Sequence, residues 1–187
     1  MSIRGKVFVL ILLLFALLGG ADCLIQRFII FPSFLELEYR EAGDNLRRIV
    51  YAIDREILFL DKLCHDWAVW DDSYLFMQEQ PEEFATSNLN EETLAANRFN
   101  LLVFLQPDGT ILRKYSVSTE RNPIDFPFLQ TNNLPLDHLL LRFPADKTEK
   151  HQSGILDTPF GPLLFSTQEI LHSDGSGPGQ GFLIMGR

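Results

Sequence analysis

The sequence predicts an α+β fold in which a long, membrane-linked N-terminal helix packs on an antiparallel sheet of about five strands. Two observations lead to this prediction. An apolar run near the N-terminus continues into a stretch with helical periodicity, and the second half consists of short β-rich segments separated by Pro and Gly turns. Because the strands follow one another with short connections, we expect them to pair in antiparallel fashion.

Residues 1–31 are predicted to form a cytoplasmic start followed by a single transmembrane anchor. Arg4 and Lys6 precede the run VFVLILLLFALL, and the extended apolar segment is long enough to cross a hydrocarbon core of about 30 Å. It includes Asp22 and Arg27. The eleven Val, Ile, Leu and Phe residues of the run contribute about −3 to −7 kcal/mol to insertion, whereas one Asp at the bilayer centre costs about 3 kcal/mol. Insertion is therefore favoured.

A cleavable signal peptide is the alternative to an uncleaved anchor, because GGA before Asp22 provides small residues at a cleavage position. In both cases the basic start stays inside. We expect the segment to lie in the inner (cytoplasmic) membrane, with residues after about 32 in the periplasm or outside. Residues 32–187 form the predicted extracytoplasmic domain, and the chain's net charge of −9 argues against a nucleic-acid partner.

Residues 33–78 are predicted to form one long helix. Pro32 suits its start and Pro81 suits a stop just beyond its end. A stripe with alternating steps of four and three residues follows one face of the predicted helix: Leu46, Val50, Ile53, Ile57, Leu60, Cys64, Trp67, Asp71 and Tyr74. Such a stripe is typical of a coiled coil, so a homodimer through this helix is one hypothesis, and packing against the chain's own sheet is the other.

The stretch HDWAVWDDSYLFM, residues 65–77, places an acid on that stripe. Asp71 occupies a position where an apolar residue is expected, and a buried acid costs several kcal/mol unless it is paired or hydrogen-bonded. One interpretation is structural: Asp71 accepts hydrogen bonds from the backbone of a loop that crosses the helix. The other is functional: Asp71 faces a pocket for a cationic or hydrogen-bond-donating small ligand, with aromatic walls. The candidate ligand-binding residues are Asp66, Trp67, Trp70, Asp71, Asp72 and Tyr74.

The sheet domain is expected over residues 84–187. NLLVFL and TILRKYSV around QPDG predict a β-hairpin, and SGILDTPFGPLLFSTQEIL predicts two further strands around a Pro/Gly turn. PLDHLLLRF, residues 135–143, predicts a short amphipathic helix with Pro in its first turn. SDGSGPGQG, residues 173–181, predicts a flexible loop, and GFLIMG predicts the last strand.

Catalytic and metal-binding motifs are absent from the sequence. No nucleophile elbow, zinc-protease helix, phosphate loop or dinucleotide fingerprint occurs. The two cysteines form no CxxC pair, and the four histidines are scattered. We therefore expect no enzymatic activity, no metal and no cofactor; an exported hydrolase is the least supported alternative.

The basic start, the apolar span, FPSFLELE and DWAVWDDSYLFM together resemble the fourth type of the CHASE domains, which are extracytoplasmic sensory modules of bacterial signalling receptors. SNLNEETLAANRFNLLVFLQPDGTILRKY and the closing GFLIMGR are similar to the same family, whereas residues 118–150 match it loosely. The resemblance implies a PAS- or Cache-like antiparallel sheet behind a membrane-linked helix. It also implies that the domain feeds diguanylate cyclase, phosphodiesterase or histidine kinase modules inside the cell.

The resemblance makes a sensor domain for an unknown small ligand or partner the expected function. The sequence departs from the receptor pattern because it reaches Arg187 without a second apolar span or an output domain. The alternatives are a dimerising interaction module, a truncated receptor fragment with no ligand of its own, or an input subunit that works through a partner.

Overall fold

The computed structural model describes residues 2–143 and 150–187. The chain divides into two compact units, residues 1–52 and residues 53–187, which are described in turn. Each unit is built from the secondary structure that its own sequence pattern favours.

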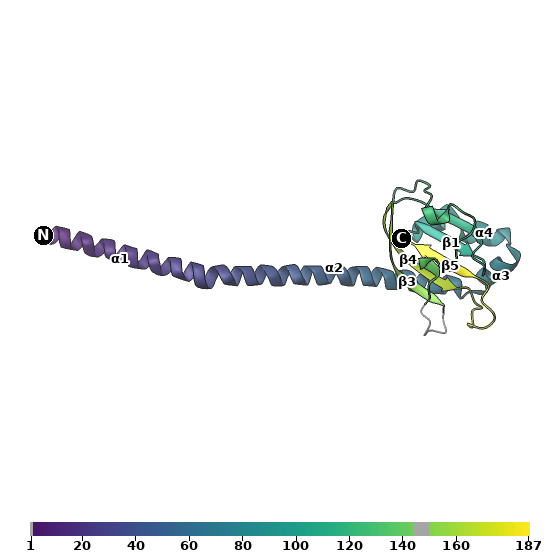
Figure 1. The fold of residues 1–187 in the computed structure, drawn as a ribbon, viewed down its shortest axis with the longest axis horizontal. Helices are drawn as coiled ribbons and strands as arrows, with labels where there is room; N and C mark the ends of the chain where they lie inside the picture. Colours follow the sequence, from purple (N-terminus) through teal and green to yellow (C-terminus); the bar gives the residue numbers. More distant parts are fainter. Residues whose placement is uncertain (1, 144–149) are drawn as a thin grey trace. The chain divides into compact units, whose positions relative to one another are not determined.

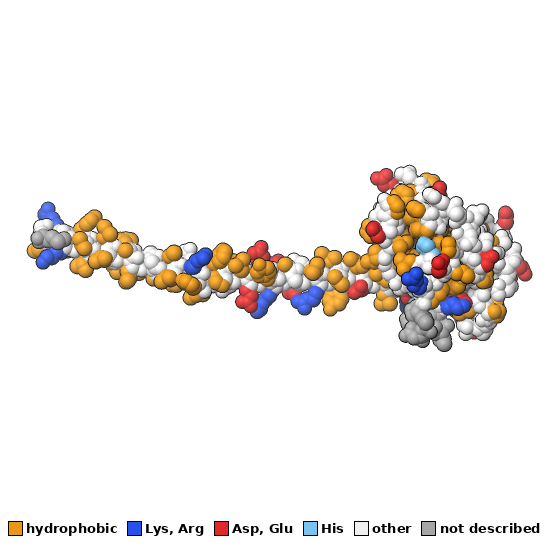
Figure 2. All heavy atoms as spheres, viewed as in Figure 1, with side chains coloured by type: hydrophobic (Ala, Val, Ile, Leu, Met, Phe, Trp, Pro, Cys, Tyr) orange, Lys and Arg blue, Asp and Glu red, His pale blue; other side chains and the backbone are white. Residues whose placement is uncertain are grey.

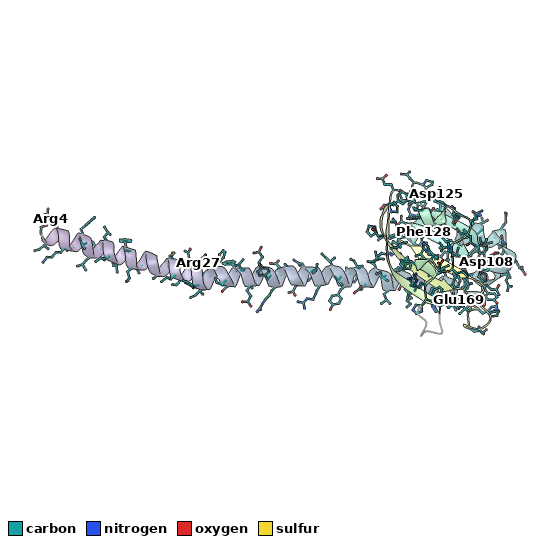
Figure 3. All side chains as sticks on the ribbon, viewed as in Figure 1. Arg4, Arg27, Asp108, Asp125, Phe128 and Glu169 are labelled. Carbon is teal, nitrogen blue, oxygen red and sulfur yellow. The ribbon has the colours of Figure 1, made fainter. Side chains whose placement is uncertain are left out.

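The first unit is helical from Ile3 onward. It contains α1, Ile3–Ile25, a π-helical turn, Gln26–Ile30, and the first part of α2, Phe31–Ala68. Large apolar side chains from Ile3 to Leu18 are between 43% and 82% exposed, and many of them are visible along this part of the helix in Figure 2. Arg4 lies near one end of this apolar segment, and Arg27 lies beyond its other end (Figure 3). In the described part of the chain this is the one helical region that is long and apolar enough to cross a membrane.

The second unit is organised around a five-stranded antiparallel sheet with the order β2-β1-β5-β4-β3 (Figure 1). The strands are β1, Leu101–Leu105; β2, Ile111–Ser116; β3, His151–Thr158; β4, Gly161–Glu169; and β5, Phe182–Gly186. Every residue of β1 is buried, and so are all five residues of β5. The predicted α+β fold with a long helix and about five antiparallel strands is therefore confirmed.

Each face of the sheet carries its own apolar core because neighbouring side chains on a strand point to opposite faces. On one face, Leu183 and Met185 of β5 pack with Leu60, Cys64 and Ala68 of α2. On the other face the core is formed by strand residues and by the segment after β2; its members include Leu101, Val103, Phe126, Leu129, Leu134, Leu140, Phe182 and Ile184. The sheet is thus covered on both sides.

The β1–β2 hairpin depends on a glycine. Gly109 has a φ of +88°, and a Cβ atom at this position would lie 2.2 Å from the carbonyl oxygen of Leu134. Thr110 N–H donates to the carboxylate of Asp108 over 2.9 Å, which closes the turn. The Pro-Asp-Gly signal in the sequence therefore predicts this turn correctly, and a larger residue at position 109 would clash with the backbone that crosses it.

The predicted single helix over residues 33–78 is wrong in one respect, because the structure contains two helices there. α2 ends at Ala68, Val69 forms a β-bridge with Leu171, and α3, Asp71–Glu79, follows. Trp70 between them is extended, with φ −142° and ψ 131°. The interruption has a tertiary cause: Leu171 N–H donates to the carbonyl of Ala68 over 3.2 Å, so strand-like pairing replaces the next helical turn.

Two further short helices follow α3, namely α4, Glu82–Asn88, and α5, Glu91–Ala96. The expected helix over residues 135–143 is reduced to a single 3₁₀ turn, Leu139–Leu141. The consecutive residues Leu140 and Leu141 are both buried against the sheet, and His138 Nδ1 accepts from Leu140 N–H over 3.2 Å. Burial of adjacent leucines and this side-chain hydrogen bond favour a tight turn over an amphipathic helix.

Candidate functional site

The residues of the tryptophan–aspartate motif lie around the junction between α2 and α3. Because the helix is interrupted at Val69 and Trp70, the residues after the break face different neighbours from those that a continuous stripe would give them. Asp71 becomes the first residue of α3, and its side chain is 63% exposed. The expectation that Asp71 lies on a buried stripe is therefore wrong.

Asp71 holds the loop that connects β4 to β5. Its Oδ1 accepts from His172 Nδ1 over 2.9 Å and from Ser173 N–H over 3.1 Å. In return, Asp71 N–H donates to Ser173 Oγ over 3.0 Å, which satisfies one of the free N–H groups at the start of α3. The hydrogen bond from Ser173 N–H is of the kind that the structural interpretation of Asp71 predicts, because the acid binds the backbone of a loop that crosses the helix.

Tyr74 holds the same loop from the next turn of α3. Its ring is 6% exposed and stacks on His172, with 3.7 Å between the ring centroids. The hydroxyl donates to the carbonyl of Pro178 over 3.3 Å and accepts from Gln180 Nε2 over 2.9 Å. The segment 172–181 is therefore bonded at both of its ends to α3, in contrast to the free loop that its glycine content predicts.

The hydrogen bonds of Asp71 also change its ionisation. The pKa of Asp71 lies below its ordinary value, first because the His172 side chain donates to the carboxylate, and then because Ser173 donates to it. The pKa of Asp174 in the same loop is likewise lowered, mainly by hydrogen bonds from Ser176. Both acids are thus held in the charged form, which accepts hydrogen bonds but does not donate them.

Two other motif residues lie away from this loop contact. Trp67 is half-buried and packs edge-to-face on Phe99, with 5.9 Å between the ring centroids, so it belongs to the core. Asp66 is exposed on α2. The structure therefore does not gather the six predicted residues into one pocket.

The remaining two, Trp70 and Asp72, line a cleft of about 480 Å³ beside α3 and α4. Trp70 is half-buried and tilts against the buried ring of Phe84, with 5.8 Å between the centroids. The other lining residues are Leu75, Pro81, Glu83, Ser87 and Asn88. Its volume is within the range of small-molecule sites, and its lining combines aromatic rings with a few polar groups.

A second cleft, of about 300 Å³, is lined in part by the docked loop. His65, Gln168 and Ser173 are among its lining residues. Lys150 and Glu169 also line it, and Lys150 Nζ donates to Glu169 Oε1 over 2.8 Å. Lys150 and Glu169 of this cleft are already paired with each other, whereas no Lys, Arg or His lines the cleft beside Trp70.

Sequence reasoning missed the partners of the motif. His172 was only one of four scattered histidines, and 173–181 was expected to be a flexible loop, yet both contact α3. Phe84 and Glu83 of α4 were not singled out either. No local pattern reports these contacts, because each partner is separated from the motif by a turn or by about one hundred residues.

Within residues 2–143 and 150–187, no group of three or more His, Cys, Asp or Glu side chains is placed to hold a metal ion.

Comparison with known proteins gives three findings. The CHASE4 domain matches residues 52–187 of this chain. The methanogenesis regulatory histidine kinase FilI of Methanothrix harundinacea (strain 6Ac) is 26% identical over 155 residues, which are 81% of this chain and 17% of that protein. The crystal structure of an extracellular domain assigned to a histidine kinase, vpHK1S-Z8, superposes with a TM-score of 0.59 at 13% identity, over 81% of this chain and 59% of that one.

These comparisons carry different weight. At 13% identity, the likeness to the solved domain shows the fold alone. The chain spans less than a fifth of the length of the curated kinase that it matches. The family match covers most of the chain and includes the α2–α3 junction, both clefts and the whole sheet.

Proposed function

This chain belongs to the CHASE4 domain family, and from that premise we propose that it is the extracytoplasmic signal-input domain of a membrane-anchored receptor and binds a small ligand. The match confirms the resemblance predicted from the motif residues. The histidine kinase relative supports a receptor context, and the exposed apolar helix in residues 3–25 supports the membrane anchor. Location in the inner membrane, export of residues after about 32, a PAS-like sheet and the lack of enzymatic activity remain predictions.

The observation that carries the ligand-binding part is the cleft beside α3 and α4. It is built by two of the six residues that the motif singled out, Trp70 and Asp72. Trp70 is the last residue before α3, so its indole follows any shift of the α2–α3 junction. Occupation of the cleft would therefore act on the helix that leads toward the membrane-linked unit.

A thermal-unfolding screen of the full chain in detergent micelles tests this proposal. A ligand at one hundred times its dissociation constant stabilises the folded state by about 2.7 kcal/mol, which raises the unfolding midpoint by several degrees. We expect a compound that raises the midpoint of the parent chain and has no effect on Trp70→Leu. Asp66→Asn is the control, because Asp66 is exposed and does not line the cleft. Compounds that stabilise the parent and Trp70→Leu equally would place ligand binding elsewhere.

A second candidate function is a dimerising interaction module. The observation that favours it is the exposure of the apolar stripe on α2, where Leu46, Val50 and Ile53 are 64%, 48% and 36% exposed. A second copy of the chain would cover such a stripe. Dimerisation and ligand binding are compatible, and the substitutions that test them lie on different elements.

A further inference from the structure

The cleft beside α3 and α4, called here the Trp70 cleft, has an unbalanced charge. Two carboxylates line it, those of Asp72 and Glu83, together with the indole of Trp70 and the ring of Phe84. None of its eight lining residues is Lys, Arg or His. The aliphatic side chains of Leu75 and Pro81 complete the apolar part of the wall.

The positions of Asp72 and Glu83 also have a simpler explanation, which is stabilisation of a helix N-terminus. Asp72 is in the first turn of α3 and Glu83 is in the first turn of α4, where a negative charge stabilises a helix N-terminus. Each of these turns contains a second acid that can do the same, Asp71 in α3 and Glu82 in α4. Neither of those neighbours lines the Trp70 cleft. Stabilisation of the helix N-termini therefore explains all four acids. It does not explain why Asp72 and Glu83 line one cleft together with the rings of Trp70 and Phe84.

The chemistry of the lining selects for positive charge. Carboxylates attract a cation and repel an anion, and the effect is larger beside low-dielectric aromatic walls than in open water. The face of an indole ring attracts an ammonium group within about 6 Å of the ring centroid, more strongly than the other aromatic side chains do. Apolar substituents on the cation would in addition displace water from Trp70, Leu75 and Phe84.

We propose that the Trp70 cleft binds a small organic cation, an alkylammonium ion whose charge lies between Trp70 and the carboxylates of Asp72 and Glu83. This inference rests on the proposed ligand-sensing function and names the class of ligand. The volume of about 480 Å³ is within the range of small-ligand sites, so a cation with several carbon substituents fits.

Calorimetric titration of the full chain in detergent micelles tests the inference with two probes of matched shape. Choline carries the positive charge, and 3,3-dimethylbutan-1-ol has the same shape without it. We expect saturable binding of choline and at least about tenfold weaker binding of the neutral alcohol, because the cation–π and carboxylate interactions are lost. In a Trp67→Phe background Trp70 is the remaining tryptophan, and choline should change its fluorescence with the same dissociation constant.

Matched substitutions locate the site. Asp72→Asn and Glu83→Gln should each weaken choline binding by about threefold to tenfold, and Trp70→Leu by at least tenfold. Glu82→Gln removes the same charge from the same turn of α4 but not from the cleft, so it should change the affinity by less than about twofold. Unfolding midpoints of all variants confirm that each remains folded.

Three outcomes would overturn the inference: no saturable binding of choline, equal affinity for choline and the alcohol, or equal loss of affinity in Glu82→Gln and Glu83→Gln. Its failure is distinguishable from failure of the proposed function. If a neutral or anionic compound stabilises the parent chain and not Trp70→Leu, the cleft is a ligand site for another chemical class. If every compound that stabilises the parent chain stabilises Trp70→Leu equally, the cleft is not the ligand site, and the proposed function fails at this site as well.

Discussion

At the scale of single residues, Asp71 and Asp72 are neighbours with different surroundings. Asp71 accepts hydrogen bonds from His172 and Ser173 of the β4–β5 loop, whereas Asp72 lines the Trp70 cleft. The two side chains leave the first turn of α3 about 100° apart, which accounts for the separation. Substitution of one can therefore be used as a control for the other.

Asp71→Asn should loosen the loop over residues 172–181. The amide keeps the shape of the carboxylate but accepts weaker hydrogen bonds, since charge-assisted bonds are roughly twice as strong as neutral ones. We expect amide hydrogens in 173–181 to exchange severalfold faster in the variant, as measured by mass spectrometry, and Asp72→Asn to leave their exchange unchanged. Equal protection of the loop in the parent and in Asp71→Asn would contradict the role assigned to this carboxylate.

The same contact should depend on pH in a defined direction. The pKa of Asp71 is lowered in the folded state from an ordinary value of 3.8, so its ionised form stabilises the fold. This contribution is fully present above the ordinary value and is lost as the pH falls through the lower, folded value. The difference in unfolding midpoint between the parent and Asp71→Asn should be constant near neutral pH and should shrink as the pH falls below about 4.

At the scale of elements, α2 has two kinds of surface along its length. Leu60, Cys64 and Ala68 are fully buried against the sheet, whereas Leu46 and Val50 are more than 40% exposed. Packing of the stripe against the chain's own sheet is therefore confirmed at Leu60 and Cys64. The first part is left for a partner or for solvent.

Val50→Glu should weaken self-association of the chain if the exposed stripe is a dimer contact. A charge on a buried helix–helix seam costs several kcal/mol, so the dimer population should fall in analytical ultracentrifugation of the full chain in detergent. Arg48→Glu is the control, because position 48 lies about 160° from position 50 on the helix. An unchanged dimer in Val50→Glu would exclude this stripe, and a monomeric parent would exclude the dimer.

Arg187 links the end of β5 to α2 and to the end of α5. Its guanidinium donates to Glu56 Oε2 over 3.2 Å and to the carbonyl of Asn97 over 2.8 Å, and it lies 5.5 Å from the ring centroid of Phe59. The side chain is 18% exposed, so its hydrogen bonds are only partly screened by solvent. The central strand is thereby linked to α2, the helix that continues into the unit of residues 1–52.

Arg187→Ala should lower the free energy of unfolding by about 1–3 kcal/mol, because charged hydrogen bonds and packing on Phe59 are lost together. The midpoint of thermal unfolding should fall by several degrees. Arg113→Ala on β2 removes an exposed arginine and should leave the midpoint nearly unchanged. Equal midpoints for the parent and Arg187→Ala would show that the strand end is held by its backbone pairing alone.

The elements that the sequence predicts well are those with a local cause. The apolar N-terminal helix, the Pro-Asp-Gly hairpin and the short apolar run of β5 follow from neighbouring residues. The break at Val69 does not, because the groups that interrupt the helix, Leu171 and Ser173, are about one hundred residues away. The periodicity from Leu60 to Tyr74 fits an uninterrupted helix equally well.

The candidate site shows the same limit. The residue types of the motif identified the α2–α3 junction as unusual, yet they did not reveal which partner each side chain would have. Trp67 packs on Phe99 in the core. Tyr74 forms hydrogen bonds with Pro178 and Gln180 of the loop, and Trp70 lines a cleft. These roles are decided by tertiary packing, which a single sequence does not report.

At the scale of the whole molecule, the proposed topology has a direct test. Alkaline phosphatase is active after export and green fluorescent protein fluoresces when it folds inside the cell. We therefore expect that alkaline phosphatase fused after Arg187 is active and that green fluorescent protein fused at the same position does not fluoresce. The reason is that Arg4 and Lys6 keep the N-terminus in the cytoplasm. The opposite pair of signals would place the sheet domain in the cytoplasm and contradict the extracytoplasmic proposal.

The strand order also affects how the protein acquires its structure. β5 is the last of the five strands in the chain, yet it lies at the centre of the sheet and pairs with β1, whose residues precede it by about eighty positions (Figure 1). The sheet cannot close until residue 186 has been synthesised, and pairing over such a separation is slow because loop-closure entropy must be overcome first. Until residue 186 has been made, the nascent sheet lacks its central strand, and a chain whose sheet is still open can be threaded through a membrane channel more easily than a closed domain.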